Sequence, residues 1–338
     1  MKILFLGGNG NISWHCVNEA LKKNHEVWEL NREKTLNTRR NIQPEVHKLK
    51  CDIHDIKKMK QLLDGFCFDI VIDFICFNES DAKEAVDIFM KHTKCFIFIS
   101  SDSVYKRSGK NLPFKENCEK YAPYNVDIYV GGKIMAEQVF SEAYKNDNFP
   151  ITIIRPAYTY DTIIPVSVGH NCFTAPQKYI DGKPALIAGD GTNLWTFTHS
   201  SNFASALIAL IDNPEIVGQA FNIASDEWLS WNEEMEILFR ALSIKSYKAI
   251  HIPYDEALKI TCFQSKDLMA QRMWHNIYDI KKIQDYVPKW KVQISFEEGI
   301  KKTIDWLMEK DIRRRYNERY DIELNKLYIK YEGEKNEM

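Results

Sequence analysis

The sequence contains no run of 18 apolar residues and no pair of cysteines spaced Cys-x-x-Cys. The first absence argues against a membrane-spanning helix, which needs about 20 consecutive apolar residues. The second argues against the common zinc and redox motifs, so the 8 cysteines are expected to be reduced thiols of a cytoplasmic protein without a metal site. The N-terminal stretch MKILFLGG lacks the longer apolar region and the cleavage site of a signal peptide.

The chain also has little net charge. Lys and Arg total 45, Asp and Glu total 47, and the net charge is −2. This balance gives no general attraction for nucleic acid or for anionic lipid. Hydrophobic residues make up 45% of the 338 positions, which is enough for one large α/β domain with an appendage or for two domains.

Short apolar runs alternate with amphipathic stretches over the first 155 residues. Runs that are apolar throughout suit strands covered on both faces, and strand–helix alternation predicts a parallel sheet. The predicted helices include residues 14–23 and 80–91, and the predicted strands are 2–6, 26–30, 46–50, 69–75, 95–100 and 151–155. The expected fold class is therefore α/β with a doubly wound parallel sheet.

A glycine-rich turn, FLGGNGNIS, places Gly7 and Gly10 directly after the first predicted strand and before the first predicted helix. Glycines here let the backbone approach a pyrophosphate, and a helix N-terminus offers free N–H groups and a partial positive charge. Asn11 and Ile12 belong to the same turn, and Ser13 stands where a third glycine is usual. The turn predicts a dinucleotide site on a Rossmann-like sheet, the alternative being a plain tight turn.

The end of the second predicted strand bears on the choice between NAD and NADP, because an acid there binds the ribose 2′-hydroxyl of NAD. This strand ends in Asn31 and Arg32, and Glu29 is expected on the other side of the pleat. Arg32 favours the 2′-phosphate of NADP, although it also suits a solvated surface charge. After the third strand, Asp52 is expected to meet the adenine amino group and Ile53 the adenine ring. The expected cofactor is NAD(P), with a preference for NADP.

Tyr129 and Lys133 form one of four Tyr-x-x-x-Lys spacings in the chain, and chance alone supplies roughly one or two. Tyr129/Lys133 alone lies on a predicted helix downstream of a strand that ends in serines. Residues four apart on a helix share a face, so both side chains can reach one site. The other three spacings, which lack this context, are Tyr179/Lys183, Tyr278/Lys282 and Tyr331/Lys335.

Gly131 and Gly132 lie between Tyr129 and Lys133. Each glycine costs about 1 kcal/mol of helix propensity. Their lack of side chains predicts that another surface, either a cofactor or a packed strand, approaches the helix closely at this point.

Together, GGNGNIS, the DI after the third strand, ISSDSVY, YVGGK and RPAYTY resemble the extended short-chain dehydrogenase/reductase superfamily. More narrowly, the chain resembles the NAD-dependent epimerase/dehydratase family, which includes UDP-galactose 4-epimerase. The likeness runs from residue 1 to about 307 and is much more specific for the fold than for the reaction.

The resemblance implies a role for each matching residue. Tyr129 would be the general acid/base, Lys133 would hold the nicotinamide ribose, and Ser101 would hydrogen-bond the reacting oxygen, with Asp102 as a further catalytic candidate. A phenol with a pKa of about 10 needs roughly 4 kcal/mol of phenolate stabilisation to act near pH 7, which an ammonium and an oxidised nicotinamide can supply. Besides Tyr129 and Lys133, the implied cofactor contacts are Phe74, Ile75, Pro156 and Tyr158.

The later part of the chain has a looser pattern, with a predicted helix at 203–212 and one more strand at 219–224. We expect residues 1–165 to form mainly the dinucleotide-binding domain, with its sheet completed by residues from about 195 to 225. Residues 166–308 would form mainly a smaller, substrate-binding α/β portion. Residues 309–338 are highly charged, and the spacing of their apolar residues predicts one helix, either packed on its own chain or binding a partner. That stripe comprises Ile312, Tyr316, Leu324, Leu327 and Tyr331.

The substrate half departs from the nucleotide-sugar enzymes of the family, in which an arginine after a glycine-rich turn clamps the phosphates. Trp195 stands about where that arginine is expected. An indole can stack on a sugar face but cannot neutralise a phosphate, and it equally suits a core position. Arg272 is a candidate for a phosphate contact from the other side or for a structural salt bridge, and Ser103 is a candidate substrate contact.

Sugar dehydratases of the superfamily carry Thr-Asp-Glu where this chain has Ser101-Asp102-Ser103. The acid is present, but the glutamate that would remove a proton is not. We therefore expect an NAD(P)-dependent epimerase or ketoreductase acting on a sugar or nucleotide-sugar-like substrate. The alternatives are a sugar dehydratase and a non-catalytic nucleotide-sensing or RNA-binding member. The expected partner is a small molecule rather than a membrane or nucleic acid, and a homodimer is compatible with the resemblance.

Overall fold

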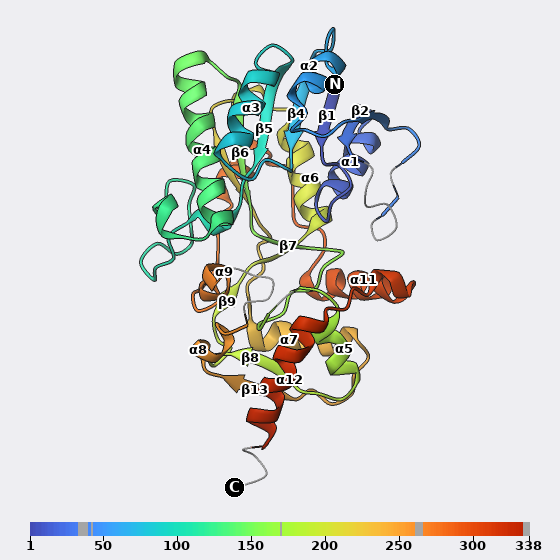
Figure 1. Cartoon of the computed structure of the whole chain (residues 1–338), viewed down its shortest axis with the longest axis vertical. Helices are drawn as coiled ribbons and strands as arrows, with labels where there is room; N and C mark the ends of the chain where they lie inside the picture. The colour runs from blue at the N-terminus through green and yellow to red at the C-terminus, as the bar shows by residue number, and fades with distance from the viewer. Residues whose placement is uncertain (33–39, 42, 170, 261–265, 334–338) are drawn as a thin grey trace.

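The structure, a computed structural model, describes residues 1–32, 40–41, 43–169, 171–260 and 266–333. The chain forms an upper portion that contains the N-terminus and a lower portion from which the C-terminal helix extends (Figure 1). Within the described ranges, no helix combines the length and the apolar character that crossing a bilayer requires.

A parallel sheet of 7 strands in the order β11-β6-β5-β4-β1-β2-β3 forms the centre of the upper portion. The chain winds outward from β1 to β3 and then returns to the other side of β1 at β4. This strand order confirms the predicted fold class, α/β with a doubly wound parallel sheet. Doubly wound sheets bind their ligands at such a reversal. The strands are β1 (Lys2–Leu6), β2 (Glu26–Asn31), β3 (His47–Lys50), β4 (Phe68–Asp73), β5 (Thr93–Ile99), β6 (Ile151–Pro156) and β11 (Ala220–Ile223).

Both faces of this sheet are covered by helices, which explains why its strands are apolar throughout. Ile3 and Phe5 of β1 face one layer of helices, and Leu4 and Leu6 face the other, because side chains alternate along a strand. The first layer contains α1 (Ser13–Lys22), α6 (Ser200–Leu210) and α10 (Lys281–Tyr286), and the second contains α2 (Ile56–Leu62), α3 (Glu79–Phe89) and α4 (Ile128–Asp147).

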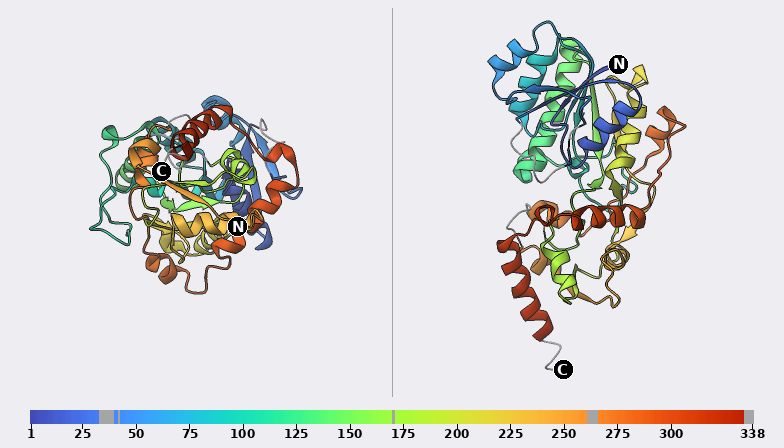
Figure 2. Two further views of the ribbon diagram at one scale, coloured as in Figure 1. Left: turned by 90° about the horizontal axis from the view of Figure 1, so that it is seen from below. Right: turned by 90° about the vertical axis from the view of Figure 1, so that its right-hand side faces the viewer.

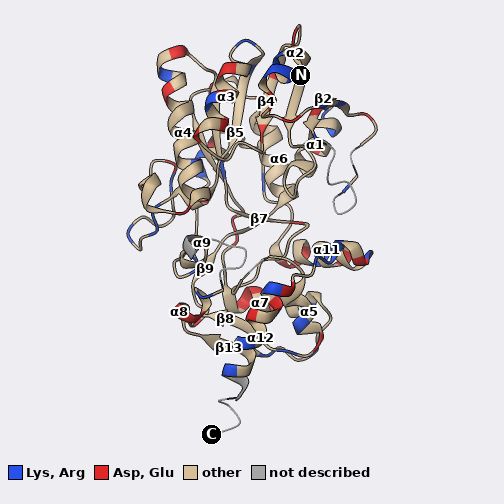
Figure 3. Cartoon of the chain, in the orientation of Figure 1, with Lys and Arg blue, Asp and Glu red and all other residues tan. Residues whose placement is uncertain are grey.

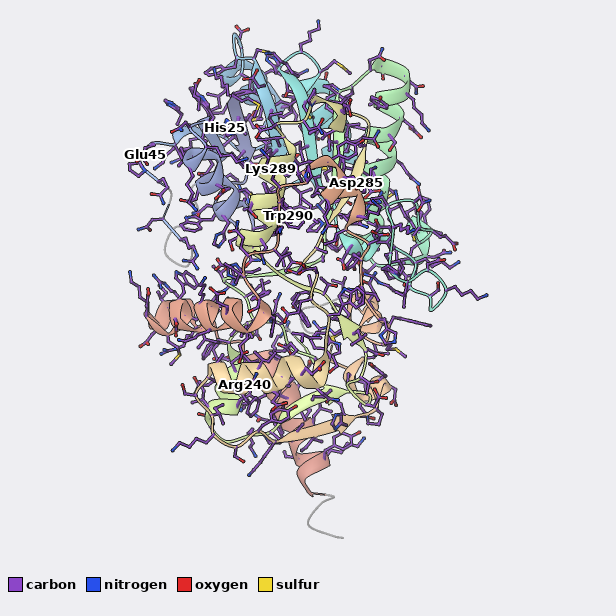
Figure 4. All side chains as sticks on the ribbon, turned by 180° about the vertical axis from the view of Figure 1, so that it is seen from behind. His25, Glu45, Arg240, Asp285, Lys289 and Trp290 are labelled. Carbon is purple, nitrogen blue, oxygen red and sulfur yellow. The ribbon has the colours of Figure 1, made fainter. Side chains whose placement is uncertain are left out.

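All the strands predicted from the sequence in this sheet are present, with ends that differ by at most two residues. β4 ends earlier than predicted, at Asp73, because the carboxylate of Asp73 accepts hydrogen bonds from the N–H groups of Ile75 and Cys76. The late strand predicted at 219–224 is β11, which pairs with β6 at the edge of the sheet. Trp290 packs against α6 on the rear of the molecule (Figure 4), where its Nε1 donates to Ser205 Oγ at 3.0 Å.

The lower portion has short strand pairs and its own apolar core. Its parallel pairs are β7 (Tyr158–Tyr160) with β10 (Phe197–His199) and β8 (Ala185–Ala188) with β13 (Ala249–Ile252). β9 (Leu194–Trp195) pairs with β12 (Leu229–Ser230) in the antiparallel sense. The helices around them are α5 (Thr174–Ile180), α7 (Trp231–Ala241), α8 (Tyr254–Ala257), α9 (Lys266–Gln271) and α11 (Phe296–Met308).

The C-terminal helix α12 (Glu318–Gly333) runs along the lower portion and points away from the sheet (Figure 2). Leu324 and Leu327 are buried against the lower core, so the helix packs on its own chain. Ile312 and Tyr316 are exposed and precede the helix, because the Asn317 side chain accepts from Tyr320 N–H and starts α12 there. The predicted single stripe is wrong for these two residues, and residues 334–338 lie outside the described part.

Candidate active site

The glycine turn after β1 has a backbone that favours glycine. Gly7 has a φ of +82°, and a Cβ atom there would lie 2.6 Å from Ile75 Cγ2. The buried Ser13 Oγ donates to Gly7 O at 2.6 Å and accepts from Gly10 N–H at 2.7 Å, so this serine closes the turn. The N-cap residue of α1, Ile12, makes no side-chain capping hydrogen bond. The helix start and the turn therefore fit the pyrophosphate of a dinucleotide.

Asn11 connects this turn to the segment after β7. Its Oδ1 accepts from the N–H and the hydroxyl of Thr162 at 2.9 and 3.1 Å, and its Nδ2 donates to Thr159 O at 3.3 Å. The side chain is thus used to join the two portions of the molecule. A cofactor contact by Asn11 would accordingly come from its backbone.

A cluster of charged side chains around the buried Asp161 strengthens the same connection. Arg40 donates two hydrogen bonds to Asp161, from Nε at 3.0 Å and from Nη2 at 2.7 Å, and His15 Nε2 lies 3.1 Å from Asp161 Oδ2. The Arg40 guanidinium lies over the rings of Trp14 and Trp306, 4.9 and 4.8 Å from their centroids. Burial would raise the pKa of Asp161, but the hydrogen bonds from His15 and Arg40 outweigh it and hold the pKa well below its usual range. The cluster ties α1 to α11 across the junction of the two portions.

The end of β2 differs from the expectation in one respect. Asn31 Nδ2 donates to Glu29 Oε1 at 2.6 Å, and a Cβ atom on Gly8 would lie 2.9 Å from the Glu29 carboxyl carbon. Glu29 therefore shares a face with Asn31 and lies against the glycine turn, so its predicted place across the pleat is wrong. Residues two apart on a strand share a face. Arg32 is largely exposed, with Nη1 3.4 Å from Asp52 Oδ2.

The loop after β4 brings Phe74 to the cavity described next and Ile75 to Gly7. Ile53, predicted to contact adenine, packs at the margin of the core on the second face of the sheet. These residues surround the switch point between β1 and β4. The structure thus gathers the predicted cofactor-binding residues around one end of the sheet.

A cavity of about 370 Å³ opens at the carboxyl ends of β1, β4, β5 and β6. It contains both catalytic and substrate candidates from the sequence, together with residues that the sequence did not indicate. The predicted residues in its wall are Ile12, Phe74, Ser101, Asp102, Ser103, Tyr129, Lys133, Pro156, Tyr158, Trp195 and Arg272. Those outside its wall are Gly7, Gly10, Asn11, Asn31, Arg32, Asp52, Ile53 and Ile75.

Ser101 and Tyr129 face each other in this cavity. Ser101 follows β5, and its Oγ accepts hydrogen bonds from the N–H and the hydroxyl of Ser103 at 3.2 and 2.8 Å. Tyr129 lies in the first turn of α4, whose N-cap, Asp127, accepts from Tyr129 N–H at 2.8 Å. Tyr129 is 37% exposed, and the rest of its side chain is buried in the cavity wall. This burial raises the pKa of Tyr129, while a hydrogen bond with Ser101 acts in the opposite direction.

Lys133 lies one helical turn beyond Tyr129 and is buried. Its Nζ donates to the carbonyl oxygens of Cys76 at 2.7 Å and Ile99 at 2.8 Å, and burial lowers the pKa of Lys133 to about 8. The two glycines before it allow close packing, but the segments that approach them are the loop at Phe77 and the short helix that begins at Pro123, rather than the expected cofactor or strand. A Cβ atom would lie 2.3 Å from the backbone oxygen of Pro123 if it were on Gly131, and 2.3 Å from that of Phe77 if it were on Gly132.

Asp102 lies in the cavity wall but is tied to the lower portion of the molecule. Its Oδ2 accepts from Asn276 Nδ2 at 3.1 Å and from the Tyr278 hydroxyl, and it lies 3.3 Å from Arg107 Nη2. Its Oδ1 accepts a long hydrogen bond of 3.4 Å from Ser101 Oγ. Asp102 thus acts as an acceptor on both oxygens.

Trp195 is both a core residue and a residue of the cavity wall, the two positions between which the sequence left the choice open. It is 4% exposed, its ring centroid lies 5.1 Å from that of Trp231, and its Nε1 donates to Trp274 O at 3.1 Å. It therefore belongs to the aromatic core of the lower portion while also lining the cavity. An arginine at this position would have to enter that aromatic core.

Arg272 is buried and also lines the cavity. Its Nη1 donates to the carbonyl oxygens of Ser167 at 2.9 Å and Gly169 at 3.2 Å, and its guanidinium lies 5.5 Å from the Trp231 ring centroid. These contacts fix the chain segment after β7. They give Arg272 a structural role whether or not it also contacts a substrate.

The three other Tyr-x-x-x-Lys spacings do not reach the cavity wall as pairs. Tyr179 lies in the lower core, and Lys335 lies outside the described part of the chain. Tyr278, however, donates to Asp102 and accepts from Arg107 Nη1 at 3.3 Å, so it helps to fix the position of Asp102 in the cavity wall. The sequence did not indicate this role, nor those of Arg107 and Asn276 beside Asp102. It also did not indicate Gln271, which lines the cavity and accepts from Arg107 Nη2 at 3.0 Å.

A doubly wound sheet with a glycine turn at its switch point, and Ser101, Tyr129 and Lys133 around one cavity, is the arrangement of the extended short-chain dehydrogenases/reductases. The chain belongs to the NAD-dependent epimerase/dehydratase family, whose model matches residues 3–224.

Two curated relatives and one solved structure illustrate the range of this family. The chain is 23% identical over 333 residues to the UDP-N-acetyl-alpha-D-glucosaminuronate decarboxylase of Bacillus cytotoxicus, covering 91% of this chain and 98% of that protein. It is 25% identical over 307 residues to the decarboxylating sterol-4-alpha-carboxylate 3-dehydrogenase of Candida albicans, covering 81% of each. The UDP-glucuronic acid 4-epimerase of Bacillus cereus, in complex with UDP-glucuronic acid and NAD, superposes with a TM-score of 0.71 at 18% identity. That match covers 91% of this chain and 99% of the epimerase.

Proposed function

We propose that the protein is an NAD(P)-dependent epimerase or ketoreductase that acts on a hydroxyl-bearing carbon of a sugar or nucleotide-sugar-like substrate. The observation that carries this proposal is the meeting of Ser101, Tyr129 and Lys133 in one cavity at the switch point of the sheet. Mass spectrometry of the cofactor that copurifies tests it. Retained oxidised cofactor would favour an epimerase, and an empty site a reductase.

In this mechanism the bound nicotinamide supplies the hydride acceptor and donor. Tyr129 removes the proton from the substrate hydroxyl as the carbonyl forms, and it returns a proton when the carbonyl is reduced. Ser101 hydrogen-bonds the same oxygen and holds it beside the phenol. Burial raises the pKa of Tyr129 and the hydrogen bond with Ser101 lowers it. A bound, positively charged nicotinamide would act in the same direction as Ser101.

The surroundings of Asp102 make a dehydratase the weaker alternative. A dehydratase needs a general acid for the departing hydroxyl, whereas Asp102 accepts hydrogen bonds on both carboxylate oxygens. The base expected two residues after Ser101 is replaced by Ser103, which donates to Ser101. We therefore assign Asp102 to positioning Ser101 and the lower portion.

A non-catalytic, RNA-binding function is also the weaker alternative. RNA-binding proteins usually present a basic stripe, whereas basic and acidic residues are interspersed over both portions in Figure 3. We also propose a cytoplasmic location, since the 7 described cysteines are free and suit a reducing compartment. A homodimer remains a prediction.

For the cofactor, we expect NADP(H) to bind more tightly than NAD(H), because Arg32 is exposed and can meet a 2′-phosphate, whereas Glu29 is buried and accepts a hydrogen bond from Asn31. A hydrogen bond to a charged group contributes about 1.5–3 kcal/mol, so Arg32→Ala should weaken NADP(H) roughly tenfold to a hundredfold and leave NAD(H) unchanged. Fluorescence titration of the reduced cofactors measures both. Equal or tighter binding of NAD(H) by the wild type would show that Arg32 only pairs with Asp52, as the 3.4 Å contact already allows.

For the substrate, we expect nucleoside diphosphate sugars to bind weakly, because Trp195 occupies the place of the phosphate-clamping arginine. Loss of the charged contact between that arginine and a phosphate should lower the affinity roughly tenfold to a hundredfold. Calorimetric titration with UDP-glucuronic acid, beside the Bacillus cereus epimerase as a comparator, measures this difference. Equal affinities of the two proteins would indicate that Arg272 binds the phosphates instead. The proposed substrate would then be an ordinary nucleotide sugar.

A further inference from the structure

Two charged side chains, Asp73 and Lys133, hydrogen-bond the backbone N–H and the backbone carbonyl of Cys76, respectively. Asp73 Oδ1 accepts from the N–H groups of Ile75 at 2.7 Å and Cys76 at 3.0 Å. Lys133 Nζ donates to Cys76 O at 2.7 Å. The loop between them brings Phe74 and Phe77 to the cavity wall, so its shape depends on both charged side chains.

Asp73 and Lys133 are both 2% exposed, so water contributes little to stabilising either charge. The other groups that face Lys133 are the Cys76 thiol, Glu137 on α4 and Asp81 on α3.

Two of these carboxylates are engaged elsewhere. Glu137 accepts hydrogen bonds from Arg155 and Lys120, which offset its charge. Asp81 accepts from Phe77 N–H at 2.7 Å and lies 3.9 Å from His54 Nδ1. For Asp73, by contrast, Lys133 is the cation that acts on it.

We propose that Asp73 is a positioning residue for Lys133, whose ammonium it keeps charged while both side chains fix the loop at Cys76. The inference rests on the proposed role of Lys133 toward the cofactor ribose. Burial raises the pKa of Asp73 to about 6 and lowers that of Lys133 to about 8, so both groups are charged between these values. Lys133 loses its charge as the pH rises through about 8, and Asp73 loses its charge as the pH falls through about 6.

The test separates the charge of Asp73 from its role as an acceptor. Asp73→Asn keeps an oxygen for the two N–H groups but loses the charge, whereas Asp73→Ala loses both. The first measurement is the titration of the Lys133 13Cε signal in the apoprotein, assigned with Lys133→Arg. The second is the pH dependence of NADH and NADPH binding.

We expect Lys133 to titrate near pH 8 in the wild type and about one unit lower in Asp73→Asn, the smallest effect usual for removing a neighbouring opposite charge. The midpoint of the loss of cofactor affinity at alkaline pH should fall by the same amount. Asp73→Glu, which keeps the charge, should restore the wild-type midpoint, and Asp81→Asn should shift it less.

An unchanged midpoint in Asp73→Asn would overturn the proposal. If that variant does not fold, the reciprocal measurement decides: the pKa of Asp73, about 6 in the wild type, should rise in Lys133→Met, and an unchanged value would overturn the proposal. Because the apoprotein titration needs no substrate, its result is independent of whether the proposed reaction is correct.

Discussion

Replacing Tyr129 by Phe should lower kcat at least a hundredfold and leave the dissociation constant of the cofactor nearly unchanged. The phenol is required to move a proton in the transition state, and general acid–base catalysis contributes typically 10²–10⁴-fold. Its ring also packs near Phe77, with the centroids 6.5 Å apart, and phenylalanine preserves that contact. The measurements are steady-state turnover on the substrate and fluorescence titration of the cofactor.

A matched control is Tyr124→Phe, because Tyr124 precedes α4 and is 85% exposed. This control should keep wild-type turnover. A loss of less than about tenfold in Tyr129→Phe, well below the usual contribution of an acid/base, would show that Tyr129 does not move the proton. A loss of cofactor affinity as large as the loss of kcat would instead show that Tyr129 contributes to cofactor binding.

The largest expected effect on stability is that of Glu137→Leu. Glu137 is 1% exposed, and its Oε1 accepts from Ser100 Oγ at 2.6 Å and from Arg155 Nε at 2.8 Å. Its Oε2 accepts from Arg155 Nη2 at 2.8 Å and from Lys120. Removing one partner of a buried ion pair leaves the other charge buried, so the free energy of unfolding should fall by about 3–5 kcal/mol. Urea unfolding at pH 7 measures this change.

Glu142→Gln on the exposed face of the same helix is the control, with an expected change within about 0.5 kcal/mol. The double variant Glu137→Leu/Arg155→Leu should recover part of the loss, because no buried charge then remains unpaired. A loss below about 1 kcal/mol in Glu137→Leu would contradict the assignment of this network to stability.

The same network makes a prediction about pH. Burial would raise the pKa of Glu137, but Arg155 and Lys120 outweigh it and lower the pKa from 4.5 to about 2. The stabilisation is therefore complete above about pH 4.5 and is lost as the pH falls toward 2. The difference in unfolding free energy between the wild type and Glu137→Leu should narrow over this acidic range.

The sequence was informative wherever the structure is local. The glycine turn follows β1 directly, and the serine-ended strand before α4 selected Tyr129 and Lys133 from four equal spacings. The partners of Asp102 could not be found in this way. Asn276 and Tyr278 are 174 and 176 positions away, and no helical or strand period relates residues so distant in the chain.

Two errors have similarly specific causes. The expected position of Glu29 is wrong because β2 stays regular through Asn31, so that Glu29, two residues earlier, lies on the same face and accepts a hydrogen bond from Asn31. The stripe at the C-terminus was read as one helix because apolar spacing alone does not reveal the cap at Asn317 that divides it. The second depends on a side-chain hydrogen bond, which a hydrophobic pattern does not encode.

The late position of β11 and α6 in the chain affects how the protein is made. β6 ends at Pro156, but α6, one of the helices on the first face of the sheet, and β11, the strand at its edge, end only at Leu210 and Ile223. At about 5–20 residues per second, a ribosome needs roughly 3 to 13 seconds to add those remaining residues. During that interval the nascent chain exposes an apolar sheet face and an unpaired strand edge. Both are surfaces on which chaperones act and from which aggregation starts.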